Sequence, residues 1–241
     1  SARSRPSPHE PWDAAARQHT VGAVTDPFAA LAAYSRLLMV CDVDSTFIGQ
    51  EVIDLLARRA GTGEQVAAIT AAAMRGELDF ADSLRARVAT LAGLPITVLA
   101  QVRHEVTLTP GVPELLEWAA ENGHSVALVS GGFHEVIDPL AARLGVRHVR
   151  ANRLGVREGR LTGDVDGPII DRRGKAVALR QFAALEDIPL GATIAIGDGA
   201  NDLDMLALAG LSVAFAAKPV VAERADIALP GPRLDDLLPL L

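Results

Sequence analysis

The chain has 241 residues, of which 49% are hydrophobic and 22% charged, a balance typical of a globular protein with one or two domains. Its formal net charge of −7 argues against general nucleic-acid binding, because no basic stripe is available to neutralise phosphates. No apolar segment reaches the length of a membrane span, and the polar, proline-rich residues 1–13 lack the apolar core of a signal peptide. The single cysteine, Cys41, excludes an intrachain disulfide and favours a reducing, cytoplasmic location.

The start of the chain is expected to be a tail. Prolines recur through residues 1–27, and the alanine-rich segment 28–34 predicts a short helix that leads into the first strand. We therefore expect residues 1–36 to lie outside the main fold.

An apolar run at 37–41 is followed at once by Asp42-Val43-Asp44-Ser45-Thr46-Phe47. Such a run is typical of a buried strand in a parallel sheet, and this one ends in a carboxylate. Burying Asp42 is costly unless a positive or hydrogen-bonding group meets it. Asp42 and Asp44 together suggest a metal site, a nucleophile with its acid/base partner, or both. An aspartate that simply ends a strand and caps a turn is the plain structural alternative.

The remaining elements predict an α/β fold. Four helices without an intervening strand are expected first, at 51–60, 64–74, 80–91 and 95–105, with Asp79 as the N-cap of the third. Strands and helices then alternate, which predicts a parallel sheet flanked by helices, with the helical block inserted after the first strand. The later helices are expected at 112–122, 133–144, 174–185 and 202–209, the strands at 125–129, 193–196, 211–215 and 226–229, and a hairpin at 156–161.

Three of the expected strands end in polar segments, namely Asp42-Val43-Asp44, Ser130-Gly131-Gly132 and Gly197-Asp198-Gly199-Ala200-Asn201-Asp202. Because ligands of open α/β sheets bind beyond the carboxyl ends of the strands, these segments are expected to face one crevice. Asp42 and Asp198 would supply the hard oxygen ligands that suit Mg²⁺. Ser130 and the amides after it could cradle a phosphate. Lys175 is expected in the first turn of its helix, where it opposes the helix dipole; an anion held near Asp42 would explain this placement, and a solvated surface lysine is the ordinary alternative.

These motifs, in this order, resemble those of the haloacid dehalogenase superfamily and, within it, the phosphoserine phosphatase family. The resemblance covers about residues 37–230 and includes Ala151-Asn152-Arg153-Leu154 and Leu161-Thr162-Gly163-Asp164-Val165. It implies a Rossmannoid core of residues 37–50 and 107–241, with residues 51–106 as a small helical cap domain that covers the active site.

The resemblance also implies an activity, the Mg²⁺-dependent hydrolysis of L-phosphoserine to L-serine and phosphate, the last step of serine biosynthesis. Asp42 would be the nucleophile that becomes an aspartyl phosphate, and Asp44 the general acid/base. The metal would be held by Asp42, the backbone carbonyl of Asp44 and Asp198. The phosphoryl oxygens would be bound by Ser130, Gly131 and Lys175. Support for the metal and its waters would come from Asp202 and from Asn201, which would also border the substrate.

In the cap, the resemblance assigns the substrate to four residues, Glu51, Met74, Phe80 and Arg87. Glu51 would meet the amino group of phosphoserine, and the guanidinium of Arg87 would pair with its planar carboxylate. Met74 and Phe80 would shield the substrate from water, although core packing is the alternative for this pair. The spacing alone does not tell which of Arg85 and Arg87 points inward.

Two features depart from the family pattern. Phe47 stands where an aliphatic residue is commoner, and is expected to tighten the rim of the pocket. Residues 1–36 are too short for the N-terminal regulatory domain of many relatives, so that mode of serine feedback is not expected unless the natural chain is longer. Outside the motifs, Cys41 is expected to be a small buried hydrophobe and His134 a surface histidine.

Several alternatives stay open at this point. The same mechanism could act on another small phosphomonoester or transfer phosphate to homoserine, although Glu51 with Arg87 suits an amino-acid zwitterion. A receiver-type signalling module also combines an aspartate, Mg²⁺, a hydroxyl and a lysine, but it is shorter and lacks the acid at the Asp44 position. A catalytically silent relative would lack catalytic residue types that are all present here. A small-molecule substrate, no nucleic-acid or membrane partner, and a monomer or homodimer are expected.

Overall fold

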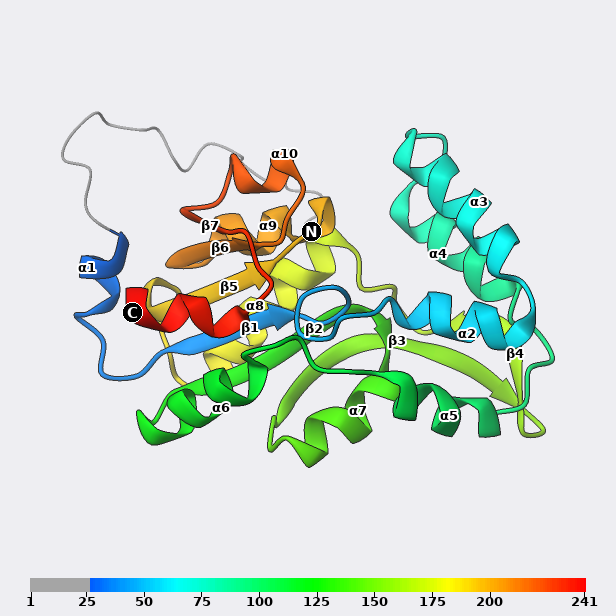
Figure 1. Cartoon of the computed structure of the whole chain (residues 1–241), viewed down its shortest axis with the longest axis horizontal. Helices are drawn as coiled ribbons and strands as arrows, with labels where there is room; N and C mark the ends of the chain where they lie inside the picture. Colours follow the sequence, from blue (N-terminus) through cyan, green and yellow to red (C-terminus); the bar gives the residue numbers. More distant parts are fainter. Residues whose placement is uncertain (1–26) are drawn as a thin grey trace, which may run out of the picture.

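The computed structural model describes residues 27–241 (Figure 1). Its described strands form one sheet in the order β4-β3-β2-β1-β5-β6-β7. Each neighbouring pair is parallel except β3 and β4, which form an antiparallel hairpin. The α/β fold expected from the sequence is confirmed. The strands are β1 Leu38–Asp42, β2 Ser125–Phe133, β3 His148–Arg157, β4 Arg160–Asp166, β5 Thr193–Gly197, β6 Leu211–Phe215 and β7 Ile227–Leu229.

Helices cover the sheet on both faces. From β1 the chain steps to β2 and β3 in one direction and to β5 and β6 in the other, so right-handed crossovers place the two sets of connecting helices on opposite faces. In Figure 1, α6 and α7 lie in the lower half of the view, whereas α9 overlaps β6 and β7 in the upper half. The α-helices are α1 Pro27–Leu31, α2 Val52–Ala60, α3 Gly63–Met74, α4 Phe80–Ala89, α5 Thr97–Glu105, α6 Val112–Glu121, α7 His134–Arg143, α8 Arg172–Leu185, α9 Leu203–Leu208 and α10 Pro219–Ala222.

The tail expected for residues 1–36 falls largely outside the described residues. The part that is described contains α1, which ends three residues earlier than the expected helix at 28–34. Within residues 27–241, none of the helices has both the length and the apolar character that spanning a bilayer requires.

Strand β1 lies at the centre of the sheet, and all of its residues are buried. It pairs with β2 on one side and β5 on the other, so that Leu38 is in register with both Ser125 and Thr193. The carboxyl ends of these three neighbouring strands therefore meet at one edge. Cys41 is buried within β1, as expected, and burial raises the pKa of its thiol to about 12.

Two elements extend beyond their expected bounds. Strand β2 was expected to end at Val129 but continues to Phe133, because the ladder with β3 skips residues 130–132 and resumes where Phe133 pairs with Asn152. The skipped residues are Ser130, Gly131 and Gly132, which form an irregularity within the strand, called the Ser-Gly-Gly segment below. Helix α8 begins at Arg172, before the expected start, because the Asp171 side chain accepts a hydrogen bond from the Gly174 amide at 2.7 Å and caps the helix.

The expected hairpin at 156–161 is present but is much longer than predicted. Its turn is at Glu158 and Gly159, whose φ values of 52° and 73° match the positive values that a tight hairpin turn demands. The strands on either side reach back to His148 and forward to Asp166. Exposed arginines along β3 interrupt the apolar alternation there, which is why the sequence pattern showed only the end of the hairpin.

The four helices expected after β1 are α2 to α5, and Figure 1 shows α3 and α4 beyond the end to which the β1 arrow points. Asp79 caps α4 as expected, since its carboxylate accepts a hydrogen bond from the Asp82 amide at 2.8 Å. The segments that enter and leave this block run side by side. Ile48 bridges Leu108, and the Gly49 amide donates to the Thr107 carbonyl at 3.0 Å.

One glutamate joins three segments at the amino-terminal ends of the strands, opposite the carboxyl ends described above. Glu186 directly follows α8 as its C-cap, and its carboxylate accepts hydrogen bonds from Arg36 Nη2 at 2.8 Å, Ser125 Oγ at 2.9 Å and His148 Nε2 at 2.5 Å. These bonds, above all the one from His148, lower the pKa of Glu186 to about 2. The starts of β1, β2 and β3 are thereby tied to the end of α8.

A carboxylate whose pKa is lowered by folding stabilises the native state above its unfolded pKa, and the contribution disappears as pH falls through the folded pKa. For Glu186 that window runs from about 4.5 down to about 2. We expect Glu186→Gln to lower the free energy of unfolding by about 1–2 kcal/mol at neutral pH. The variant should also show a weaker loss of stability across the acidic window.

Urea unfolding at several pH values measures both effects. The matched control is Glu117→Gln, at an exposed position on α6. Equal stability of the two variants at neutral pH would contradict the role assigned to the Glu186 hydrogen bonds.

Candidate active site

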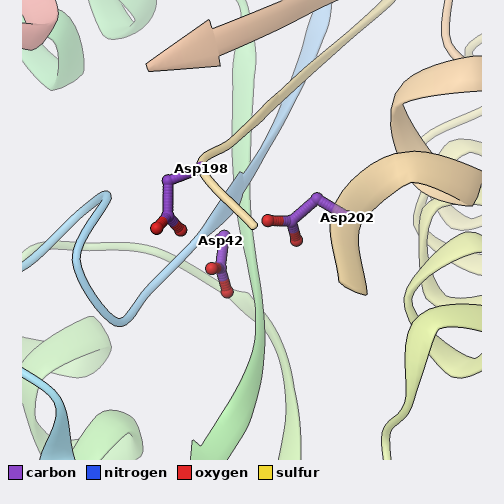
Figure 2. A group of neighbouring side chains, drawn as sticks. All are labelled: Asp42, Asp198 and Asp202. Carbon is purple, nitrogen blue, oxygen red and sulfur yellow. The ribbon is translucent and has the colours of Figure 1, made fainter. Parts of the chain in front are cut away.

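Three carboxylates meet at the carboxyl end of the central strands (Figure 2). Asp42 ends β1, Asp198 follows β5, and Asp202 ends the short helical turn after it. One oxygen of each lies within 4.8 Å of the others, and the carboxylates point toward the same space. Asp42 and Asp202 are buried, whereas Asp198 is partly exposed.

Lys175 lies between two of these acids and is fully buried. Its Nζ donates to Asp42 Oδ1 at 2.6 Å and to Asp202 Oδ1 at 2.6 Å. Although burial alone would lower the pKa of Lys175, Asp202 and Asp42 raise it above its ordinary value, so the ammonium stays charged. The structure therefore places Lys175 among anions and not in solvent.

The cluster carries more negative charge than one ammonium can balance. Burial and the charge of Asp202 raise the pKa of Asp42 well above its ordinary range, although Lys175 acts in the opposite sense. The same two causes raise the pKa of Asp198 to about 6. Three carboxylates beside one lysine leave two charges unbalanced when all are ionised, so the oxygen donors fit a hard divalent cation.

Asp202 has little freedom to serve as a direct ligand. Its Oδ1 accepts the hydrogen bond from Lys175, and its Oδ2 accepts one from the Gly199 amide at 2.9 Å. Asp198 is held more lightly, by the Thr46 hydroxyl, which donates to its Oδ1 at 3.3 Å.

Asp44 is oriented by two hydrogen bonds. Its Oδ1 accepts from the Val52 amide at the start of α2, and its Oδ2 from Ser130 Oγ, both at 2.8 Å. Burial and the charge of Glu51 raise the pKa of Asp44 to about 6, a value at which a carboxyl group exchanges protons readily near neutral pH. Glycine is needed at 132, because a Cβ there would lie 2.6 Å from Asp44 Oδ2.

Asn152 holds the Ser-Gly-Gly segment in place by a hydrogen bond to its backbone. Its Nδ2 donates to the Gly131 carbonyl and its Oδ1 accepts from the Ile170 amide, both at 2.8 Å. Ile170 directly precedes the cap of α8, the helix that carries Lys175. The buried Asn152 side chain thus joins two parts of the site. In the sequence, Asn152 stands out only as part of the motif at residues 151–154, which assigns it no role.

A cavity of about 670 Å³ opens between the carboxylates and the helices α3 and α4. All five residues expected to contact the substrate border it, namely Glu51, Met74, Phe80, Arg87 and Asn201. Met74 is nevertheless 67% exposed, so it lies at the edge.

The structure decides between the two neighbouring arginines. Arg87 borders the cavity, whereas the exposed Arg85 pairs with Asp82 at 3.1 Å. Glu51 accepts a hydrogen bond from Ser45 Oγ at 2.8 Å. The ring of Phe80 lies so close to Gly131 that a Cβ there would be 2.9 Å from its Cζ. The expected role of Phe47 at the pocket rim is wrong, since Phe47 is fully buried in the core and does not border the cavity.

Two further cations, Arg172 and Lys218, border the cavity, and no sequence motif points to them. Arg172 precedes Lys175 by three residues on α8, a spacing that could have indicated a shared helix face. Its Nε donates to Asp204 at 2.7 Å. Lys218 follows β6, and its backbone amide donates to the Asp198 carbonyl at 3.3 Å. Its place beyond the carboxyl end of a strand is the signal that could have revealed it.

Removing the buried cation tests how the cluster is balanced. We expect Lys175→Met to lower the free energy of unfolding by about 3–5 kcal/mol, because it leaves buried carboxylates without a partner. The double variant Lys175→Met/Asp202→Asn should recover part of this loss. Urea unfolding measures both; a single variant as stable as the parent would contradict the argument.

The structure thus presents an acid, Asp42, at the end of the central strand of a parallel sheet, next to the end of β2 that carries Ser130 and two glycines. The family model described as haloacid dehalogenase-like hydrolase matches residues 39–207. The chain therefore belongs to the haloacid dehalogenase-like hydrolases.

Within this family, the chain is similar in sequence to known phosphoserine phosphatases. The chain is 55% identical over 213 residues to the phosphoserine phosphatase of Streptomyces coelicolor, an alignment that covers 88% of this chain and 52% of that protein. It is 50% identical over 184 residues to the phosphoserine phosphatase of Lactococcus lactis, covering 76% and 85% respectively. The chain thus spans about half the length of the first relative and most of the second.

A solved structure is also similar. It is described as a phospho-aspartyl intermediate analogue of phosphoserine phosphatase, and it superposes with a TM-score of 0.80 at 41% identity. The match covers 86% of this chain and 99% of that one.

Proposed function

We propose that this protein is a Mg²⁺-dependent phosphatase that hydrolyses L-phosphoserine to L-serine and phosphate. The observation that carries the proposal is that Asp42 and Asp44 open into one cavity that is also bordered by Glu51 and Arg87. The first pair suits phosphoryl transfer and the second an amino-acid zwitterion. The activity named for the relatives supports the same substrate. The single buried cysteine supports a cytoplasmic location, where this reaction would complete serine biosynthesis.

In the first step, a carboxylate oxygen of Asp42 attacks phosphorus, and the bond from phosphorus to the serine oxygen breaks. Asp44 donates its proton to that oxygen, so serine leaves neutral at its hydroxyl and Asp42 carries the phosphoryl group. The Lys175 ammonium, the Ser130 hydroxyl and the Gly131 amide would hold the phosphoryl oxygens as charge develops on them. Lys175 already contacts Asp42 at 2.6 Å, which orients the attacking group.

In the second step, Asp44 accepts a proton from water while the water oxygen attacks phosphorus. The bond between phosphorus and Asp42 breaks, which releases inorganic phosphate and restores both carboxyl groups to their starting protonation. One residue can serve as acid and then as base because the Val52 amide holds Asp44 in place through its Oδ1, which leaves Oδ2 for the proton once Ser130 turns to the phosphoryl group.

Mg²⁺ would be held by Asp42, Asp198 and the backbone carbonyl of Asp44. Asp202 would support the site through its hydrogen bonds with Lys175 and the Gly199 amide, and Asn201 would assist it. When bound, the ion supplies positive charge that offsets the repulsion between the carboxylates and the phosphate.

We infer that residues 51–106 form a cap over a core of residues 37–50 and 107–241. Arg87 would pair with the substrate carboxylate and Glu51 with its ammonium, while Phe80 and Met74 exclude water. The contact of Phe80 with Gly131 supports this arrangement, because it brings the helical block onto the Ser-Gly-Gly segment that would bind the phosphate.

The decisive experiment is phosphate release from L-phosphoserine and from a panel of other phosphomonoesters, with and without Mg²⁺. We expect a strong preference for phosphoserine, and a fall of at least about 1,000-fold in kcat for Asp42→Asn. Thermal unfolding of the isosteric variant controls for folding. Asp42-dependent release from other esters instead would keep the mechanism and overturn the substrate. No Asp42-dependent release from any ester would overturn the phosphatase.

Substrate recognition by the cap is tested with a truncated ester. We expect Arg87→Lys to raise KM for L-phosphoserine about 10- to 100-fold, because the ammonium cannot form the bidentate pair with a carboxylate. Phosphoethanolamine lacks that carboxylate, so its kcat/KM should change little. The control is Arg85→Lys, which alters the exposed neighbouring arginine. Equal effects of Arg87→Lys on both esters would refute the assignment.

A further inference from the structure

The helical block of residues 51–106 gives few hydrogen-bond donors to the cavity at the carboxylate cluster. Of the side chains that it contributes to the lining, only those of Thr70, Ser83 and Arg87 carry a donor. The others are apolar, except the carboxylate of Glu51. Arg87 has a place in the proposed function as the partner of the substrate carboxylate, whereas the two hydroxyl groups have none.

Ser83 is the more deeply placed of the two hydroxyl residues. It is only 2% exposed, whereas Thr70 is partly exposed. Its backbone is fully engaged, since its amide donates to the Asp79 carbonyl at 3.0 Å and its carbonyl accepts from Arg87 Nε at 3.3 Å. Its side-chain Oγ makes no hydrogen bond with any described residue. A helical serine can turn its hydroxyl to the carbonyl four residues earlier, and Ser83 does not.

The oxygen of this hydroxyl is open and not sealed inside the protein. Among the described residues, the side-chain polar atom that is both fully enclosed and without a partner is Glu135 Oε2. Ser83 Oγ also lacks a partner but is not fully enclosed, so the small exposed part of Ser83 includes this oxygen, at the cavity that the residue borders. An unpaired buried hydroxyl is unfavourable, so in native proteins such a group usually meets a partner that is not part of the chain.

Ser83 and Arg87 lie one turn apart on the same face of α4. Helical side chains lean toward the N-terminus of their helix, so Arg87 reaches back over Ser83, as the hydrogen bond from its Nε to the Ser83 carbonyl shows. The two Nη groups of Arg87 make no hydrogen bond with the described residues. The hydroxyl and the guanidinium fork are therefore neighbouring free donors on one wall of the cavity.

A substrate carboxylate is the group that needs both donors. It offers about four acceptor positions, of which a bidentate pair with Arg87 would use two. The charges acting on this guanidinium all come from carboxyl groups, namely Glu51, Asp54 and Asp44, so no second cation stands beside it. Resting on the function proposed above, we propose that the Ser83 hydroxyl donates a hydrogen bond to the substrate carboxylate beside Arg87. Ser83 is then a specificity-determining residue for esters that carry a carboxylate.

The plain structural alternative is that α4 needs a small residue at this position. Alanine would meet that need as well as serine does, and it forms helices readily. Ser83→Ala therefore separates the two roles, because it removes the hydroxyl without adding volume. Ser83→Cys keeps a side chain of similar shape but replaces the hydroxyl by a weak donor, which gives a second, independent variant.

The test compares kcat/KM on three phosphate esters. L-phosphoserine carries both charged groups, phosphoethanolamine lacks the carboxylate, and the phosphate ester of 3-hydroxypropionate lacks the ammonium. We expect both Ser83 variants to lose about 10-fold or more in kcat/KM on the two esters with a carboxylate, mainly through KM. On phosphoethanolamine they should change about twofold at most. The matched control is Thr97→Ala, which removes an exposed hydroxyl from α5 of the same block.

A double variant tests whether the two donors share one ligand group. Ser83→Ala combined with Arg87→Lys should lose less than the product of the two single losses, because both residues act on the same carboxylate. Equal losses on all three esters, or an unchanged kcat/KM for phosphoserine, would overturn the role of Ser83 and leave the proposed function intact. A parent protein that does not favour phosphoserine over phosphoethanolamine would overturn the proposed substrate, and this role with it.

Discussion

The ammonium of Lys175 is the interaction on which the active-site half of this molecule depends. It is fully buried and lies 2.6 Å from an oxygen of each of two acids. Asp42 comes from the central strand and Asp202 from the turn after β5, so the lysine joins α8 to both. Without it the carboxylates would repel one another in a poorly solvated space. The same group that makes the fold possible there also stands where a phosphate would need a cation.

The negative charge of the carboxylates around Lys175 is only partly neutralised. One ammonium faces the three acids that cluster there, and burial makes each ionised acid costly. The deficit favours cations, whereas an incoming phosphate brings further negative charge. Arg172 and Lys218, which also border the cavity, would reduce that repulsion for the proposed phosphate ester. Positive charge at the site is thus divided between a buried lysine and two cations that line the cavity.

What the sequence could predict depended on how local each signal was. The buried strand ending at Asp42, the Asp79 cap and the turn at Glu158-Gly159 are properties of a few adjacent residues, and all are observed. The convergence of Asp42, Ser130 and Asp198 also followed, since strand order in an α/β sheet brings carboxyl ends together.

The rest depended on contacts between distant segments. Which of Arg85 and Arg87 faces the cavity depends on how α4 is rotated about its axis against its neighbours, and the sequence pattern does not determine this rotation. His134 was misjudged because its partner, the Ala151 amide, arrives on another strand. Asn152 acquired its role only when β3 brought it under Gly131. Phe47 follows a catalytic motif in sequence, yet the chain turns it into the core.

The paired segments at the base of the helical block limit how that block can move. Ile48 bridges Leu108, and Gln50 exchanges two side-chain hydrogen bonds with Thr107, at 2.6 and 2.9 Å. Glu51 directly follows Gln50, so the paired segments fix the point at which Glu51 reaches the cavity beside Asp44. The helical block is also joined to the hairpin of β3 and β4, where the Gly93 amide donates to the Leu161 carbonyl at 2.8 Å and the Leu161 amide donates to the Leu94 carbonyl at 2.9 Å. Attachment at two separate places restrains the block against turning about its base as well as against sliding along the sheet.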